Sequence, residues 1–210
     1  GGGVEIDECG ICGGNGTQVG FSCDGIPLEF VYNQSSLQAF YYFNTVTIDG
    51  ENVDANDWVG AFNGDICVGA RQWDTTGSCS DNQFADETAC VEADGTWTWN
   101  QCGGGVCDLP LMGNDGYPET AGYMMPGEIP TFKIYDASEN TYYAAVASAD
   151  IPWMNFGLPT IENLNAEPDC AGILGGSAEL DGCGVCDENS ENDCIEDCNG
   201  DWGGSATEDS

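Results

Sequence analysis

Basic side chains are almost absent from this sequence. Lys133 and Arg71 stand against 37 aspartate and glutamate residues, histidine is missing altogether, and the formal charge is −35 at pH 7. Nucleic acids and anionic membranes are bound through clustered lysine and arginine, so both are excluded as partners. A chain with this charge needs counter-ions to stay compact, and we expect calcium to be the bound cation.

The lack of histidine also limits what the thirteen cysteines can do. Common zinc sites mix cysteine with histidine, and a cysteine nucleophile usually needs a histidine base. Disulfides in an oxidising, extracellular compartment are the better interpretation, and the chain is expected to be secreted and associated with a cell surface. We assign all of them to disulfides: Cys9, Cys12, Cys23, Cys67, Cys79, Cys90, Cys102, Cys107, Cys170, Cys183, Cys186, Cys194 and Cys198.

Long apolar runs and helical periodicity are missing as well. No apolar segment is long enough for a membrane span, so we expect no membrane insertion, and no stretch repeats apolar residues at a spacing of three and four. Aromatic and β-branched residues instead dominate 28–32 and 37–48, which predicts strands. The pair Asn63-Gly64 between two apolar runs predicts a hairpin with a type I′ turn, and 131–146 predicts a second hairpin.

These signals predict an all-β protein. We expect an antiparallel β-sandwich of immunoglobulin-like or jelly-roll type over residues 26–167, with cystine-rich irregular repeats on both sides. An insertion at 77–107 holds Cys79, Cys90, Cys102 and Cys107, and loops of this length are uncommon unless they are cross-linked. A short helical turn is expected near 86–93.

The two ends of the chain carry the same short repeat. Residues 198–210 can be laid over 170–182, and residues 1–12 over 175–186. Residues 1–25 are thus a partial repeat unit, and 168–210 contain further units. One such unit is too small and polar to bury a core, so it depends on cross-links, ions or neighbours.

Each end of the chain holds the part of the repeat unit that the other end lacks, which suggests a contact between copies. The N-terminal unit lacks the equivalent of Cys170, while Cys198 is that equivalent with its own partners missing. We expect 198–210 to dock head to tail on the N-terminal half-unit of another copy, in a processed subunit or in a longer array. The alternative is that Cys198 pairs within its own unit and another cysteine, such as one between Cys67 and Cys107, is free.

The unit from Asp169 to Cys186 resembles cysteine and aspartate repeats of large secreted proteins of marine bacteria, which are distantly similar to thrombospondin type 3 repeats. The resemblance implies calcium binding through Asp and Asn, here without the regular Asp-x-Asp-x-Asp-Gly order. The segment 50–70, with the stretch 131–143, resembles a β-sandwich module of secreted Bacteroidetes-type surface proteins. That resemblance implies an extracellular domain and carries over no catalytic residue.

Two groups of oxygen-bearing side chains are candidate calcium ligands. The first places four hard donors within nine residues, and the second surrounds the C-terminal cysteines. A solvated acidic surface is an equally good interpretation of each. The candidate metal ligands are Asp49, Glu51, Asp54 and Asp57 in the first group, and Asp187, Asn189, Asp193 and Asp201 in the second.

Other features of the chain leave the function open. Trp97 and Trp153 are candidates for stacking on a sugar, although core packing and covering of the cystine-rich insertion is the preferred interpretation. Asn15 and Asn33 begin N-glycosylation sequons. Paired carboxylates could serve a glycosidase, but among 37 acidic residues such pairs occur by chance, so we expect no enzyme.

The function predicted from the sequence is structural. We expect a subunit or repeat of an extracellular fibre or surface assembly, joined head to tail to other copies and stabilised by disulfides and calcium. The alternative is a carbohydrate-binding or adhesive module of a larger secreted protein, with a polysaccharide as partner.

Overall fold

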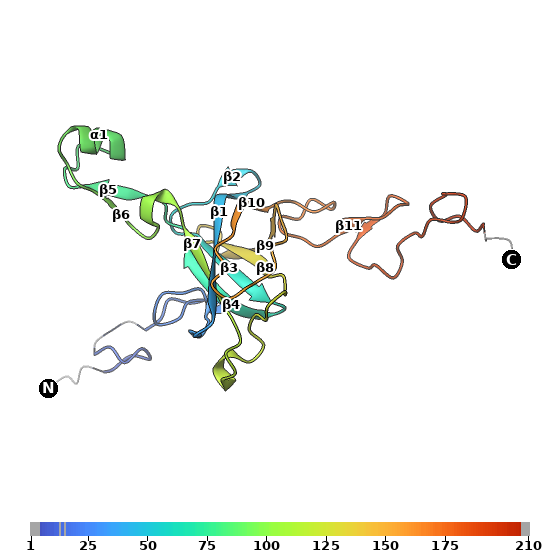
Figure 1. Cartoon of the computed structure of the whole chain (residues 1–210), viewed down its shortest axis with the longest axis horizontal. Coiled ribbons are helices and arrows are strands. Elements are labelled where there is room, and N and C mark those ends of the chain that lie inside the picture. The colour runs from blue at the N-terminus through green and yellow to red at the C-terminus, as the bar shows by residue number, and fades with distance from the viewer. Residues whose placement is uncertain (1–4, 13, 15, 207–210) are drawn as a thin grey trace.

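The structure is a computed structural model that describes residues 5–12, 14 and 16–206. A curled β-sheet forms the centre, and three segments project from it: the N-terminal arm (residues 5–25), an insertion, and the C-terminal arm (residues 168–206) (Figure 1). The strands are β1 (Gln38–Ile48), β2 (Glu51–Asn52), β3 (Trp58–Asn63), β4 (Ile66–Gln72), β5 (Gly77–Cys79), β6 (Trp97–Trp99), β7 (Asp108–Met112), β8 (Thr131–Asp136), β9 (Thr141–Ala147), β10 (Thr160–Ala166), β11 (Glu179–Leu180) and β12 (Cys186–Asp187). The helices are α1 (Glu87–Glu92) and the short 3-10 turns η1 (Leu28–Phe30), η2 (Gly103–Gly105) and η3 (Pro118–Thr120).

The central sheet has eight strands, which confirms the all-β prediction. Their order is β2-β1-β10-β9-β8-β3-β4, and β7 pairs with the first half of β1. All pairs are antiparallel except β1 with β10, which run parallel, for example at Tyr42 and Thr160. The expectation of a fully antiparallel sheet is therefore wrong for this one pair. Two parallel strands need a long connection that brings the chain back to the starting end of the sheet. The connection between β1 and β10 is long, because it contains most of the other strands of the sheet.

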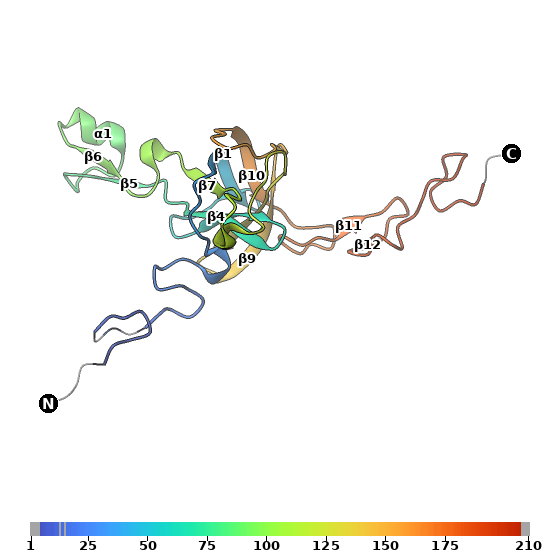
Figure 2. The same cartoon turned by 60° about the horizontal axis from the view of Figure 1, so that its bottom comes forward.

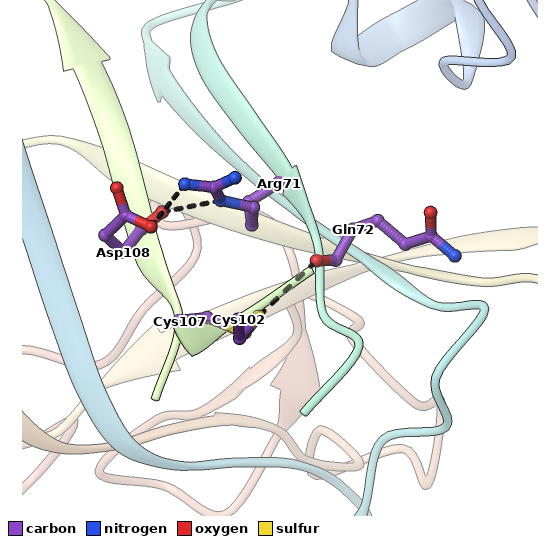
Figure 3. Close-up of polar contacts among 5 residues, drawn as sticks. All are labelled: Arg71, Gln72, Cys102, Cys107 and Asp108. Atoms are coloured by element: carbon purple, nitrogen blue, oxygen red, sulfur yellow. Dashed lines mark hydrogen bonds and ion pairs between the residues drawn. A yellow bond between two sulfur atoms is a disulfide. The ribbon is translucent and has the colours of Figure 1, made fainter. Parts of the chain in front are cut away.

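The sheet curls until β4 lies against β7. A Cβ atom on Gly69 of β4 would stand 1.6 Å from the carbonyl oxygen of Pro110 in β7, so only glycine allows this approach. Arg71 holds the same two strands together, because its Nε donates to the carbonyl oxygen of Asp108 at 2.9 Å and its Nη2 donates to the Asp108 carboxylate (Figure 3). The single arginine of the chain therefore has a structural role.

The curled sheet encloses one main core and carries a second cluster on its outer face. Trp153 and Leu111 are completely buried in the main core, where the Trp153 indole donates to the Leu111 carbonyl at 3.1 Å. On the outer face, Phe30 packs on Phe62 and Tyr142 with ring centroids 5.9 and 5.3 Å apart. Phe30, which follows the N-terminal arm, thus fixes the chain to the outer face of the sheet.

Two further contacts hold the end of the N-terminal arm and the residues that follow it on this outer face. The rings of Phe21 and Tyr135 pack edge to face, with centroids 5.7 Å apart. Lys133 pairs with Glu29 at 2.8 Å, and its ammonium group lies 4.9 Å from the centroid of the Phe62 ring. Both cationic side chains of the sequence thus hold the fold together, which leaves the acidic surface without basic neighbours of its own.

The predicted hairpins are present. The second one is formed by β8 and β9, and the first by β3 and β4, but its turn lies one residue later than expected. Asn63 still pairs with Ile66, so the central residues are Gly64, with φ of 60°, and Asp65. Only Gly64 has positive φ, and the type I′ prediction is therefore wrong. A register shift between Ala61 and Phe62 accompanies this difference.

Some elements differ from the sequence prediction. Residues 28–32 were expected to form a strand but contain the 3-10 turn η1, in which Phe30 points into the outer cluster. Strands β7 and β10 were not predicted. Strand β7 contains Pro110, and proline is unusual within a strand. Pro110 faces Phe40 of β1, but the Phe40 N–H donates to the carbonyl oxygen of Gly157, on the other side of β1. The proline thus interrupts no ladder hydrogen bond at this pair.

The insertion at 77–107 projects from the sheet as a β5–β6 hairpin with helix α1 beside it (Figure 2). The predicted helical turn is present, and Asp86 caps it by accepting the N–H of Ala89 at 2.9 Å. Disulfides Cys79–Cys90 and Cys102–Cys107 cross-link the insertion at its outer part and its base. Near the base, the Cys102 sulfur lies 3.9 Å from the Gln72 carbonyl oxygen (Figure 3).

Five disulfides form within the chain, as expected for an oxidising extracellular environment. In the part of the chain that the structure describes, no helix has the length and apolar character needed to span a membrane.

Candidate functional site

The two arms are built from one small loop that is centred on an aspartate. In the loop of Asp169, Oδ1 accepts the backbone N–H groups of Ala171 and Ile173, both at 2.9 Å, and Oδ2 accepts that of Ala178 at 3.2 Å. The N–H of Asp169 donates to the carbonyl of Ile173, so the chain turns back on itself around the carboxylate. The same arrangement recurs around Asp7, Asp181 and Asp197.

Glycine spacing explains why the sequence folds into these loops. The residue three positions after each central aspartate is a glycine with positive φ, as in Gly172 at 78°. In the loops of Asp7, Asp169 and Asp197, a second glycine follows four positions later, where a Cβ atom would collide with the carboxylate. For Gly176 this Cβ would lie 2.0 Å from Oδ2 of Asp169.

The N-terminal arm contains a fifth, simpler loop of this kind, at the point where the arm joins the sandwich. There Ser22 takes the aspartate position, and its hydroxyl accepts the N–H of Ile26 at 3.2 Å. Gly25 supplies the positive φ of 75°. The central residue of this loop is uncharged, and Phe21 and Ile26 on either side of it pack against the outer aromatic cluster.

Backbone amides stabilise the central carboxylates of the arms in their ionised form. They lower the pKa of Asp169, with the N–H of Ile173 as the largest cause, and the pKa of Asp181, with that of Val185. The pKa of Asp7 and of Asp197 is lowered in the same way, by Ile11 and Ala206 first. These carboxylates are therefore stabilised without a cation.

Three disulfides cross-link the loops of the arms, and two cysteines of the arms stay unpaired. The bonds are Cys9–Cys23, Cys170–Cys186 and Cys183–Cys194. Cys12 and Cys198 are both exposed and free. These two therefore form no disulfide within the chain, and the alternative that Cys198 pairs within its own unit is wrong.

Cys67 is the third free cysteine, and it is buried. Its side chain packs with Phe30 and Tyr135 in the outer cluster, and no other cysteine lies in that cluster. Burial raises the pKa of the Cys67 thiol to about 11. The prediction of a disulfide at Cys67 is wrong because this residue serves as a small apolar core side chain.

The predicted metal ligands of the sandwich are brought together only in part. Glu51, Asp54 and Asp57 line one cavity, which Asp136, a residue not predicted, completes. Asp49 is not among its lining residues, because it occupies the β1–β2 turn with a φ of 50°.

Within that cavity, Asp57 already has hydrogen-bond partners. Its Oδ1 accepts the N–H of Ala137 at 2.9 Å, and its Oδ2 accepts that of Asp54 at 2.7 Å. Asp57 is 4% exposed, and burial raises its pKa. Oδ1 therefore holds the loop before β3 to the turn after β8, and Oδ2 closes that loop on itself.

In the C-terminal arm, Asp187 and Asp193 line a cavity together with Glu179 and Glu188. Asn189 is not among the lining residues, and its backbone N–H donates to Asp187 at 2.8 Å. Asp201 belongs to the neighbouring loop around Asp197. Among the described residues, no three acidic, histidine or cysteine side chains converge closely enough to form a metal-binding group.

The two candidate sugar-binding tryptophans have different surroundings. Trp153 is completely buried, so it offers no face to a ligand and its prediction as a binding residue is wrong. Trp97 is partly exposed on the insertion, edge to face with Trp99 at 5.9 Å. The Trp97 indole nitrogen is buried without a hydrogen-bond partner in the described part of the chain. Asn15 lies outside the described residues.

Comparison of the chain with protein-family models, with curated proteins and with solved structures finds no match in any of the three. The resemblance to bacterial surface proteins therefore stays a prediction.

Proposed function

We propose that this chain is a structural subunit or repeat of an extracellular fibre or surface assembly, in which copies join head to tail. The observation that carries this proposal is the presence of the same aspartate-centred loop, with an exposed unpaired cysteine, on both arms. The arms leave the central sheet on opposite sides (Figures 1 and 2). A contact between one arm and the opposite arm of another copy is heterologous, and repeated contacts of this kind produce an open chain of subunits.

Charge supports contact through the ends rather than through the sides. The formal charge is −35, and both cationic side chains are engaged in holding the sandwich together. Two sandwiches side by side would therefore repel each other. Calcium remains part of the proposal as a counter-ion that lowers this repulsion. The proposed role is non-catalytic.

Negative-stain electron microscopy of the purified chain in a mildly oxidising buffer tests the proposal. We expect filaments whose subunits repeat at a constant spacing and whose length grows with protein concentration. A matched sample in a strong reductant shows how far assembly depends on cysteine. Single particles at every concentration and redox condition would refute the head-to-tail assembly.

The exposed indoles of the insertion favour a second candidate, a carbohydrate-binding or adhesive module. Trp97 and Trp99 are partly exposed on a segment that projects from the sandwich. A glycan array tests this candidate, with Trp99→Ala as the variant and Trp202→Ala as the control on the C-terminal arm. Saturable binding that only Trp99→Ala removes would support it, whereas no binding by the wild-type chain would reject it.

A further inference from the structure

The two exposed free cysteines occupy complementary positions in the repeated loop. Cys12 is the fifth residue after Asp7, as Cys186 is after Asp181. Cys198 directly follows Asp197, as Cys170 follows Asp169. Cys170 and Cys186 are bonded to each other in this chain, with their Cα atoms 5.9 Å apart. The positions that Cys12 and Cys198 occupy are thus the two positions that form a disulfide when two such loops are neighbours.

The backbone around each free cysteine already has the conformation found at the bonded pair. The bridge between Ile6 and Cys12 repeats the pairing of Leu180 with Cys186. On the other side, the bridge between Glu196 and Trp202 repeats that of Pro168 with Leu174. Because both loops are complete in themselves, docking needs little further ordering of the backbone.

We propose that Cys198 of one copy forms a disulfide with Cys12 of the next copy, in the arrangement of the Cys170–Cys186 bond. This inference rests on the proposed head-to-tail assembly and names the covalent link within it. The two cysteines cannot meet within one chain, because they lie on arms that leave opposite sides of the sheet (Figures 1 and 2). Cys67 is no competitor, because it is buried.

The bond forms by exchange with a small disulfide such as oxidised glutathione. The Cys198 thiolate attacks one sulfur, and a glutathione thiolate leaves. The Cys12 thiolate of the next copy then attacks the Cys198 sulfur of this mixed disulfide, and the second glutathione thiolate leaves. The two protein thiols lose two electrons and two protons in total, and one glutathione disulfide becomes two glutathione thiols.

Single-cysteine variants in a glutathione redox buffer test the link on non-reducing gels. We expect the wild-type chain to give a ladder of oligomers, and Cys12→Ser alone or Cys198→Ser alone to stay monomeric. A mixture of the two variants should give dimers and nothing larger, because each supplies one of the two thiols. Mass spectrometry of that dimer should find the peptide that joins Cys198 of the Cys12→Ser chain to Cys12 of the Cys198→Ser chain. Cys67→Ala is the control that should keep the ladder.

Each other outcome has a definite meaning. A ladder that persists in Cys198→Ser, a Cys198–Cys198 dimer in Cys12→Ser, or monomers in the mixture would overturn the disulfide. Filaments of Cys198→Ser in the microscope would then show that assembly survives without the covalent link. A wild-type chain that forms neither ladder nor filament would contradict the proposed assembly as well.

Discussion

Single residues of this protein have roles that follow from what surrounds them. The central aspartates of the loops in the arms accept backbone amides, which lower their pKa, whereas Asp57 is buried, which raises its pKa. The same contrast applies to the free cysteines. Cys12 and Cys198 face solvent, and Cys67 lies within an aromatic cluster. The two exposed thiols should therefore react with reagents in solution much faster than the buried thiol of Cys67.

Alkylation of the monomeric chain tests this division. With N-ethylmaleimide near neutral pH, we expect two adducts on the native protein, at Cys12 and Cys198, and a third at Cys67 only after unfolding. Burial withholds the Cys67 sulfur from the reagent, and a thiol pKa raised to about 11 leaves little thiolate. Intact-mass measurement counts the adducts. Three adducts formed at equal rates on the folded protein would contradict the burial of Cys67.

At the scale of elements, the close approach of β4 and β7 determines how the sheet curls. This approach depends on the absence of a side chain at Gly69, whereas Gly103 at the base of the insertion has no atom within 4 Å of where its Cβ would be. The two glycines therefore offer a matched pair of substitutions.

We expect Gly69→Ala to lower the free energy of unfolding by about 3 kcal/mol, because β4 must move away from Pro110 to accommodate the methyl group. Gly103→Ala should change it by less than about 0.5 kcal/mol. Urea unfolding followed by tryptophan fluorescence measures both. Equal midpoints for the two variants would show that β4 and β7 are not in contact in solution.

The loops of the arms are the second kind of element, and their stability should depend on pH. The folded-state pKa of Asp169 lies below the ordinary value of 3.8. The stabilisation by its carboxylate is therefore fully present above that ordinary value and is lost as pH falls through the lowered pKa. We expect the arms to stay ordered at pH 5 and to loosen only when the pH falls below 3.8.

Amide chemical shifts measure this transition. The N–H groups of Ile173 and Ala178, which donate to Asp169, should shift together with a midpoint below 3.8. Amides near Asp193, whose carboxylate accepts no hydrogen bond among the described residues, serve as the comparison. A midpoint at or above 3.8 for Ile173 would show that the amides do not stabilise the carboxylate.

At the scale of the whole molecule, the dominant quantity is the formal charge of −35. Hydrogen bonds from amides accommodate the central carboxylates of the arms, but most of the 37 acidic side chains have no basic partner. Mutual repulsion should therefore lower the stability of the folded chain at low ionic strength. A divalent cation that binds the folded state would offset this effect.

We expect calcium chloride to raise the melting temperature, and a chelator to lower it, in a buffer of low ionic strength. Sodium chloride at matched ionic strength is the control, because it screens charge without occupying a site. Differential scanning calorimetry with Asp54→Asn and Asp187→Asn would locate the effect in the sandwich or in the C-terminal arm. Identical melting curves with calcium and chelator would reject calcium as a stabilising ion.

Much of this architecture follows from local patterns that the sequence displays. Aromatic and β-branched runs predict β1, β8 and β9, and Gly64 marks the first hairpin, because strand propensity and positive φ act over a few residues. The repeat of glycine, aspartate and cysteine likewise places the loops at both ends and singles out Cys198, since each loop closes on hydrogen bonds that span 9 to 13 residues.

Other features were decided only by contacts between distant segments. The parallel pairing of β1 with β10, the strand around Pro110 and the burial of Cys67 and Trp153 all depend on how the sheet curls. The use of the aspartates also belongs here, because a carboxylate that accepts amides and one that binds calcium look alike in a sequence. Burial and choice of partner are properties of the folded chain, so local pattern could identify these residues without assigning their roles.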